Sequence, residues 1–389
     1  MIYMFQILFY PLVFAISLVF FWISDRSAHF WGGEQYRYLL CKIFSASGIL
    51  FLASIAGVRD VTIGTDVKVY VIDTFEKVSQ LRFTDIFISY FGIDKPIPLG
   101  FALLAWLCAH VVSDVHFFLF AIELLIIFML YVSAARFCKG RTWLCMAAYM
   151  LFFYAESMNT MKQYLAVAIC LYSLRYCFDK KIVKFICVIF IATQFHFTAL
   201  TALVYYPCVL LIKGENTGNI VSTEKTRRTF LVLITLFIFV LGYYSGSTLV
   251  RFVAEYHPTV NWSVARLGTG GTSILPIISA VLISCIFLVV KNQDKDIIYN
   301  QNLNVYVYFA IIGWLGTEFT VISPNIDRVF LYEKIFTILL IPNIFSSNKL
   351  LEKTLQLLFL LWGVVCFLYL VIYGGWYEVY PYTSEILGI

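Results

Sequence analysis

Four cationic side chains lie near the ends of predicted membrane helices, all on one predicted side of the membrane: Arg59, Lys162, Arg266 and Arg328. Few carboxylates accompany them on that side. Charge-assisted hydrogen bonds from such cations to phosphate are strong in a partly dry site. The group therefore favours a lipid-linked phosphate or pyrophosphate as ligand, although a lone Lys or Arg at a helix end often only extends its charge to the lipid headgroups.

Two further side chains near these cations are candidates for moving a proton. Asp66 follows Gly64 and Thr65, which could form a tight turn that places the carboxylate against Arg59. The positive charge would keep Asp66 ionised and lower its basicity. His196 lies in a turn between two phenylalanines, and histidine titrates near the pH at which most enzymes work. A purely structural histidine in such a turn is the competing explanation.

Polar and aromatic side chains at the same level could orient a sugar. Asn159 and Gln163 lie at the start of a helix that is predicted to begin outside. Tyr70 and Tyr332 offer ring faces on which sugars could stack, although an aromatic belt at the membrane interface is the commoner explanation. Because several separate segments agree on one side, the pattern indicates one cavity at the outer level of the membrane.

The composition of the chain indicates a membrane protein. Of the 389 residues, 61% are hydrophobic and 13% are charged, whereas soluble domains have about 25% charged residues. The net charge of +5 comes from short clusters of Lys and Arg between apolar runs, which is typical of cytoplasmic loops and argues against a nucleic-acid partner. The ten cysteines include no CxxC pair, so neither disulfides nor a structural zinc site is expected.

About twelve apolar runs are interpreted as crossings of a bilayer whose core requires roughly 20 residues per helix. A further short run, Pro98 to Val112, is expected to be a re-entrant or surface-lying helix on the outer side. We expect an all-α polytopic protein with one transmembrane domain, residues 1–389. The expected crossings are residues 4–24, 38–57, 114–135, 142–156, 158–178, 182–193, 197–212, 229–247, 273–290, 303–323, 326–345 and 354–373.

The positive-inside rule sets the orientation of these crossings. Basic clusters at residues 136–141, 175–184 and 213–228 are expected in the cytoplasm. Both termini and two long loops, residues 58–97 and 248–272, then lie outside. The first of these loops is polar with interspersed aromatics, so it is expected to contain an amphipathic interfacial helix.

Five short motifs occur in order along the chain: Arg59 to Asp66 with Tyr70 (R-x-x-x-x-G-T-D-x-x-x-Y), Pro98 to Phe101 (P-x-G-F), Asn159 to Gln163 (N-x-x-R-Q), Phe195 to Leu200 (F-H-x-S/T-A-L) and Arg328 with Tyr332 (R-x-x-x-Y). They resemble the motifs of EpsG-like and Wzy-type polysaccharide polymerases of bacterial envelopes. The resemblance runs from about residue 1 to residue 345. It departs from the family pattern where Lys162 replaces an arginine, and where the family's glutamate before Pro98 is absent, with Asp94 and Lys95 nearby.

The resemblance implies a GT-C-like glycosyltransferase that joins undecaprenyl-pyrophosphate-linked oligosaccharide repeat units, as donor and acceptor. The product would be O-antigen, capsule or exopolysaccharide, made at the outer face of the bacterial inner membrane. A chain-length regulator is the protein partner that it suggests.

In such an enzyme, cations bind the leaving pyrophosphate and a base acts on the acceptor hydroxyl. We assign Arg59, Lys162 and Arg328 to the pyrophosphate and favour His196 over Asp66 as the base. No cofactor or metal is required, because fixed cations can neutralise the leaving group. The only D-x-D, at residues 294–296, is expected in a solvated cytoplasmic loop. Side chains expected to contact substrate are Lys162, Gln163, Asn159, Tyr70, Arg266 and Tyr332.

Two other activities are compatible with the same composition. A flippase for lipid-linked oligosaccharides would have a similar number of helices, but it should place its cations in a central cavity between symmetric halves. A membrane sugar O-acyltransferase would need catalytic residues that face the cytoplasm, where its acyl donor is found. The clustering of cations on the outer side favours the polymerase.

Overall fold

Helices make up every regular element of the computed structural model. It describes residues 2–27, 33–92, 97–214, 224–256, 261–293, 301–324, 326–344 and 350–389. In these ranges the elements are α-helices with short 3-10 and π segments, and no strand occurs. The prediction of an all-helical membrane fold is confirmed to this extent.

Six helical stretches are long and apolar enough to cross a membrane. Each has at least 18 residues, which rise about 27 Å along a helix and so approach the thickness of a bilayer core. The described residues thus supply fewer full-length spans than the twelve or so expected crossings. The helices are α1 (Ile2–Arg26), α2 (Glu34–Gly57), α6 (Val115–Phe137), α12 (Glu224–Tyr256), α14 (Ile274–Gln293) and α19 (Leu350–Phe367), which continues as the π segment η7 (Leu368–Tyr373).

The remaining apolar runs are helical too, but they are shorter, less apolar or interrupted. The expected crossing at 142–156 breaks at Phe153, and the next one begins only after a second break at Thr160. Their helices are α5 (Leu99–Val111), α7 (Thr142–Phe152), α8 (Tyr154–Asn159), α9 (Met161–Phe178), α10 (Ile182–Thr193), η3 (Phe197–Val204), α11 (Tyr205–Lys213), α16 (Gln301–Gly316), η5 (Thr317–Val321), η6 (Ile326–Phe330), α17 (Leu331–Lys334) and α18 (Thr337–Ile344).

The first predicted outer loop is largely helical. It contains a π segment, η2 (Val67–Val71), followed by α3 (Ile72–Ser79) and α4 (Phe83–Gly92). On α3 the buried residues are Thr74, Phe75 and Val78, while its charged residues face outward. This helix is therefore amphipathic, as predicted, and its place at the membrane interface stays a prediction. α5 packs against α3 and leads directly into α6.

The second predicted outer loop begins later than expected. We predicted a crossing that ends at residue 247, yet α12 continues to Tyr256 and is followed by the short α13 (Asn261–Ala265). Residues 248–256 contain no glycine or proline, so nothing in the backbone chemistry stops a helix that is already formed.

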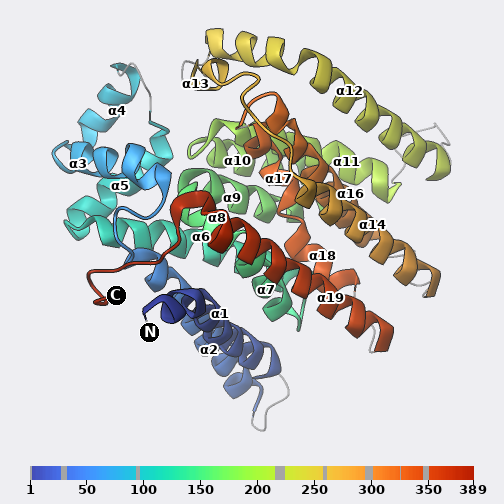
Figure 1. Cartoon of the computed structure of the whole chain (residues 1–389), viewed down its shortest axis with the longest axis horizontal. Helices are drawn as coiled ribbons and strands as arrows, with labels where there is room; N and C mark the ends of the chain where they lie inside the picture. The colour runs from blue at the N-terminus through green and yellow to red at the C-terminus, as the bar shows by residue number, and fades with distance from the viewer. Residues whose placement is uncertain are drawn as a thin grey trace.

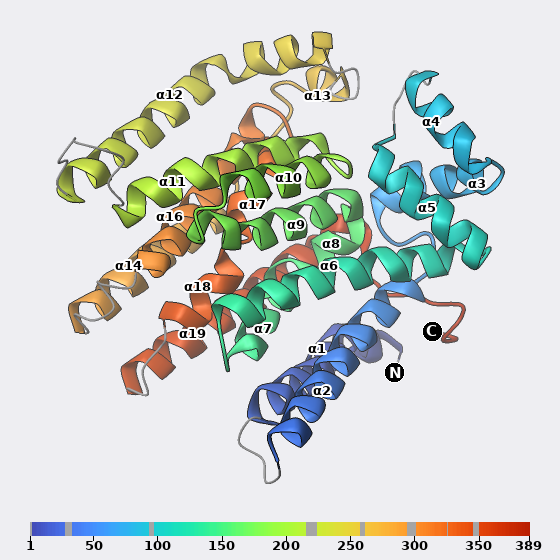
Figure 2. The same ribbon diagram turned by 180° about the vertical axis from the view of Figure 1, so that it is seen from behind.

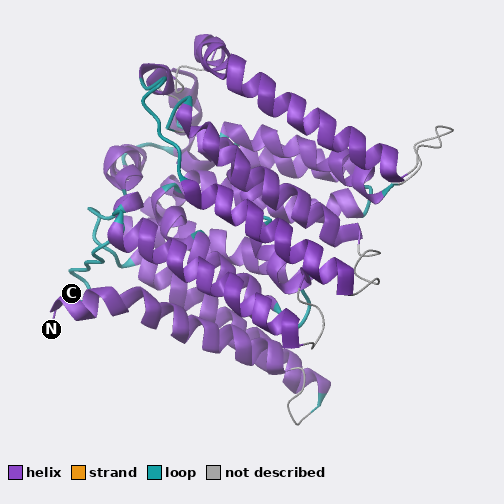
Figure 3. Ribbon diagram, turned by 45° about the vertical axis from the view of Figure 1, so that its right-hand side comes forward, coloured by secondary structure: helices purple, strands orange, loops and turns teal. Residues whose placement is uncertain are grey.

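The helices form layers between two edges (Figures 1 and 2). The α1–α2 hairpin lies at one edge and α12 at the other, with α6, α7, α9 and α16 between them. Figure 3 shows the long helices running side by side. The two termini lie at the same end of this bundle, where the Tyr10 hydroxyl donates to the Val379 carbonyl oxygen at 2.7 Å.

Candidate functional site

The loop after α2 is attached to the end of α8. Gly64 has φ +92°, and a side chain there would also bring a Cβ to 3.3 Å from the Met158 carbonyl oxygen, so the position requires glycine. Two residues later, the main-chain N–H of Asp66 donates to the Asn159 side-chain oxygen at 3.0 Å. The first and third sequence motifs are therefore joined at this point.

Asp66, Tyr70 and Lys162 form one polar cluster. The Tyr70 hydroxyl donates to an Asp66 carboxylate oxygen at 3.0 Å, and the Lys162 ammonium lies 3.8 Å from the centre of the Tyr70 ring. Burial, and then the negative charge of Asp66, raise the pKa of Tyr70 well above its ordinary value. The phenol therefore keeps its proton and remains a donor to Asp66.

Arg328 joins this cluster from η6. Its guanidinium lies 4.0 Å from the Asp66 carboxylate, and the two side chains are 30% and 14% exposed. The segment is held in place by main-chain contacts: Gln163 donates to the Arg328 carbonyl oxygen at 2.6 Å, and the Arg328 N–H donates to Asp327 at 2.8 Å. The main chain at residue 328 is thus placed independently of the pair between Arg328 and Asp66.

His196 is connected to the same place through Thr198. The His196 Nδ1 lies 2.6 Å from the Thr198 hydroxyl oxygen, which lies 3.1 Å from the Tyr332 hydroxyl. The Gln163 side-chain amide lies 3.5 Å from the same threonine oxygen. Thr198 therefore links the fourth and fifth motifs to the third. Thr198 lies within the fourth motif, but its residue type alone predicted no role for it.

The remaining motif is attached through Gly100 at the start of α5. Its N–H donates to the Gln194 carbonyl oxygen at 2.8 Å, next to the turn that carries His196. A Cβ on Gly100 would lie 2.9 Å from that oxygen, so only glycine allows this approach. Phe101 packs edge-on against Tyr70, with ring centres 5.9 Å apart. All five motifs thus meet in one region.

Arg59 has a different environment from the one we expected. Its guanidinium is fully buried and donates to the carbonyl oxygens of Ala56 and Met158, both at 2.7 Å. The side chain ties the end of α2 to the segment before α9. These contacts make Arg59 a residue that positions the loop, because a buried guanidinium bonded to main chain is not presented to a ligand.

Arg266 lies outside the five motifs that meet in this region. It is exposed in the segment after α13, which a hydrogen bond from the Gly268 N–H to the Ile322 carbonyl oxygen, at 2.8 Å, attaches to the turn after η5. Residues 294–296, Asp94 and Lys95 lie outside the described residues. Within the described ranges, no group of three or more His, Cys, Asp or Glu side chains is placed to hold a metal ion.

A buried ion pair that the sequence analysis did not identify lies behind the cluster. The Lys334 ammonium is 3.6 Å from the Glu156 carboxylate, and the two side chains are 10% and 5% exposed. The Tyr164 hydroxyl also donates to Glu156, at 3.0 Å, and Lys334 lies 4.7 Å from the Trp314 ring centre. In the sequence, the feature that points to this pair is a charged residue inside a predicted apolar crossing, Lys334 within residues 326–345.

The C-terminal segment closes over the loop that carries Asp66. The Glu378 carbonyl oxygen accepts from the Gly64 N–H at 2.9 Å, and the Thr383 carbonyl oxygen accepts from the Asp60 N–H at 3.0 Å. Glu378 also forms an ion pair with Lys68. Residues 374–389 therefore brace the first motif, although the sequence suggested only an outer tail.

Removing residues 374–389 is expected to loosen this loop. Each main-chain hydrogen bond contributes roughly 1 kcal/mol, so the amides of residues 60–66 should exchange with solvent much faster in hydrogen-exchange measurements. Glu378→Gln is the matched control, because it removes only an ion pair whose side chains are about half exposed, and such pairs contribute little. Equal exchange in the truncated and full-length proteins would contradict this role.

The sequence model of the EpsG family matches residues 42–384, most of the chain. The chain belongs to the EpsG family. The resemblance derived from the five motifs is confirmed by this match, which covers every one of them. Neither a search of curated proteins nor a search of solved structures finds a match. Membership in the EpsG family points to a polysaccharide-related polymerase role.

Proposed function

We propose that this EpsG-family protein is a glycosyltransferase that joins lipid-linked oligosaccharide repeat units into a polysaccharide. The observation that carries the proposal is the meeting of Lys162, Arg328, Asp66 and His196, from four separate segments, in one partly exposed cluster. Cations for a leaving pyrophosphate and a base for an acceptor hydroxyl are the groups that this reaction requires.

In the proposed reaction, the anomeric carbon of the donor loses its bond to the lipid pyrophosphate and gains a bond to an acceptor hydroxyl oxygen. The lipid pyrophosphate leaves with the electron pair, and Lys162 and Arg328 stabilise its charge. The hydroxyl proton passes to the base. Fixed cations supply the positive charge in this scheme, so it requires no metal ion.

His196 acts as the base in this proposal, and Thr198 selects its tautomer. The threonine oxygen can accept hydrogen bonds from Gln163 and from His196 Nδ1–H while it donates to Tyr332. This arrangement satisfies the hydroxyl fully and, with the proton on Nδ1, makes Nε2 the basic nitrogen of His196. Asp66 accepts the hydrogen bond from Tyr70 and pairs with Arg328, so in this proposal it orients those two side chains.

The substrates, partner, fold and location that we propose are those that the family resemblance implies. Donor and acceptor are undecaprenyl-pyrophosphate-linked oligosaccharides in the inner membrane of a bacterium, with a chain-length regulator as partner. The fold is of the GT-C type with about twelve crossings, in which short and broken helices such as α7 to α11 complete the count. The active site faces the periplasm or cell exterior.

The direct test uses purified protein in nanodiscs supplied with one lipid-pyrophosphate-linked repeat unit. We expect a ladder of products that differ by whole repeat units. Movement of the substrate across the bilayer without new glycosidic bonds would instead indicate a flippase. Acyl transfer from acyl-CoA onto the sugar would indicate an O-acyltransferase, and either result would contradict the proposal.

The sidedness of the cluster gives a separate prediction. A cysteine at exposed Thr62, beside the Asp66 loop, should react in intact spheroplasts with a membrane-impermeant thiol reagent in a background without reactive cysteines. A cysteine at Lys139 should react only after permeabilisation, because its basic cluster is expected in the cytoplasm. The reverse labelling pattern would place the cluster on the wrong side for this reaction.

A further inference from the structure

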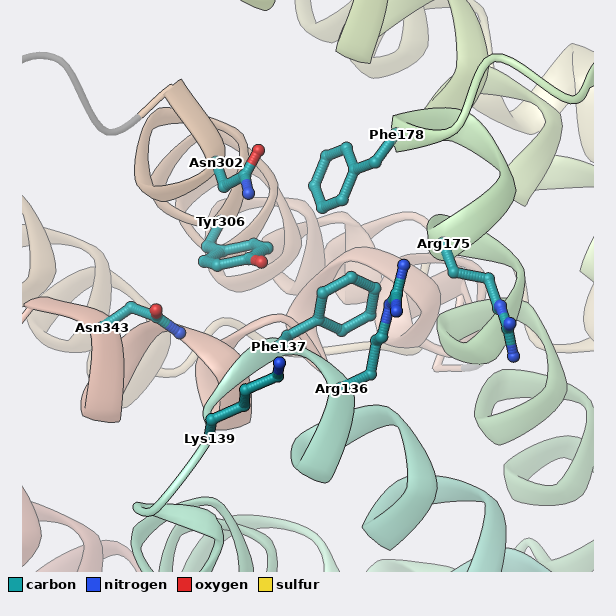
Figure 4. A pocket seen from close by; sticks show the side chains of 8 residues that line it. All are labelled: Arg136, Phe137, Lys139, Arg175, Phe178, Asn302, Tyr306 and Asn343. Carbon is teal, nitrogen blue, oxygen red and sulfur yellow. The ribbon is translucent and has the colours of Figure 1, made fainter.

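A second cationic pocket lies at the opposite ends of α6 and α9 from the candidate site. α9 begins at Met161, beside Lys162, and ends at Phe178, which lines this pocket. Its 18 residues rise about 27 Å, so the two regions lie about one helix length apart. The pocket has a volume of about 320 Å³ and is shown in Figure 4.

Three cations line this pocket: Arg136 from the last turn of α6, Lys139 from the turn that follows α6, and Arg175 from α9. Among the described residues, no carboxylate lines it. The carboxylate of Asp179 lies 3.7 Å from Arg136, with both side chains well exposed to solvent, so it cancels little of the charge. Arg175 has a buried Nε with no hydrogen-bond partner.

The rest of the lining consists of three aromatic rings from three helices and of two asparagine side chains, Asn302 and Asn343. Phe137 packs edge-on against Phe178, with ring centres 5.5 Å apart. Tyr306 of α16 lies 6.3 Å from both rings and is almost fully buried. Figure 4 shows the three rings side by side, with Arg136 and Lys139 extending beside Phe137. Cations beside apolar rings create a site where water is a poor competitor for an anion.

Positive charge at the C-terminal ends of helices complements the helix dipole, so each cation alone would need no further explanation. The dipole does not explain why three cations surround a cavity without a carboxylate. We propose that this pocket binds a phosphate group, supplied either by the headgroup of an anionic phospholipid or by a soluble phosphate ester. Basic pockets between membrane helices on the cytoplasmic side are suited to anionic headgroups.

The lipid source is tested with full-length protein in nanodiscs that contain equal amounts of phosphatidylglycerol and phosphatidylcholine. Native mass spectrometry then measures which lipids stay bound. We expect the wild type to retain phosphatidylglycerol, and the double variant Arg136→Gln/Lys139→Gln to lower the ratio of retained lipids roughly tenfold. Lys181→Gln/Lys184→Gln is the matched control: it removes two cations of the same region, one of them paired with Asp179, and should leave the ratio unchanged.

The soluble source is tested by calorimetric titration with inorganic phosphate in nanodiscs of phosphatidylcholine alone. Binding that is lost in Arg136→Gln/Lys139→Gln and kept in the control supports the pocket with a soluble ligand. If neither lipid retention nor phosphate binding distinguishes the two double variants, the proposal is overturned. These measurements do not involve polymer formation, so their outcome is independent of the proposed function.

Discussion

Replacing Arg328 with alanine is expected to lower polymer formation about 10²-fold to 10³-fold, because a charge-assisted contact to the leaving pyrophosphate is lost. The hydrogen bond from Gln163 uses the main-chain carbonyl of residue 328, so the variant keeps the contact that holds η6 in place. Single repeat units should still be displayed on cells. Gel analysis of surface polysaccharide and the nanodisc assay both measure the effect.

Arg251→Ala is the control for this variant. It removes an exposed arginine near the end of α12, predicted on the same side of the membrane, and should leave polymer length unchanged. Arg328→Lys keeps the charge without the planar fork of donors and should retain part of the activity. Wild-type polymer from Arg328→Ala would rule out the pyrophosphate assignment.

Replacing His196 with alanine is expected to lower turnover about 10²-fold to 10⁴-fold, as for other general bases. His196→Gln should recover little, because an amide can form hydrogen bonds but cannot take the acceptor proton. Thr198→Val keeps the imidazole and removes the hydroxyl that fixes its tautomer, so it should lower kcat with little change in the KM for the lipid-linked donor. Turnover of purified protein with one repeat unit checks all three variants.

Asp66→Asn distinguishes the two candidate bases. If Asp66 only holds Tyr70 and Arg328, as its contacts suggest, the amide should retain measurable turnover. Near-normal turnover of His196→Ala together with an inactive Asp66→Asn would reverse the roles and make Asp66 the base.

The members of the site could be predicted from sequence because their types are unusual in an apolar chain. Lys162, His196 and Arg328 each interrupt apolar sequence near a predicted helix end, and Asp66 lies in the first predicted outer loop. A membrane tolerates charged residues mainly where they face a partner or a cavity. The order of the motifs along the chain identified the family. The structure brings the predicted segments into contact through Asn159, Gln163 and Thr198.

The direction of each side chain could not be predicted in the same way. Arg59 has the same charge as Arg328, but only the folded loop shows that it bonds to the carbonyl oxygens of Ala56 and Met158. Glu156 and Lys334 come from segments far apart along the chain, and their pairing depends on how α8 packs against α17.

The breaks in the helices could not be predicted from hydropathy either. Phe153 and Thr160 interrupt an apolar stretch that contains no proline or glycine, so the breaks arise from tertiary contacts. One such contact is the bond from Arg59 to the Met158 carbonyl oxygen. The C-terminal segment contacts Gly64 through a main-chain hydrogen bond. Such a bond does not depend on the type of the residues, so it could not be predicted from sequence.

The most direct test of the central claim is a cryo-EM structure of the protein in a nanodisc with a phosphonate analogue of the lipid-pyrophosphate-linked sugar. We expect density for the diphosphate group between Lys162 and Arg328, with the anomeric carbon facing His196. Density for that group anywhere else, including the pocket of Arg136 and Lys139, would contradict it.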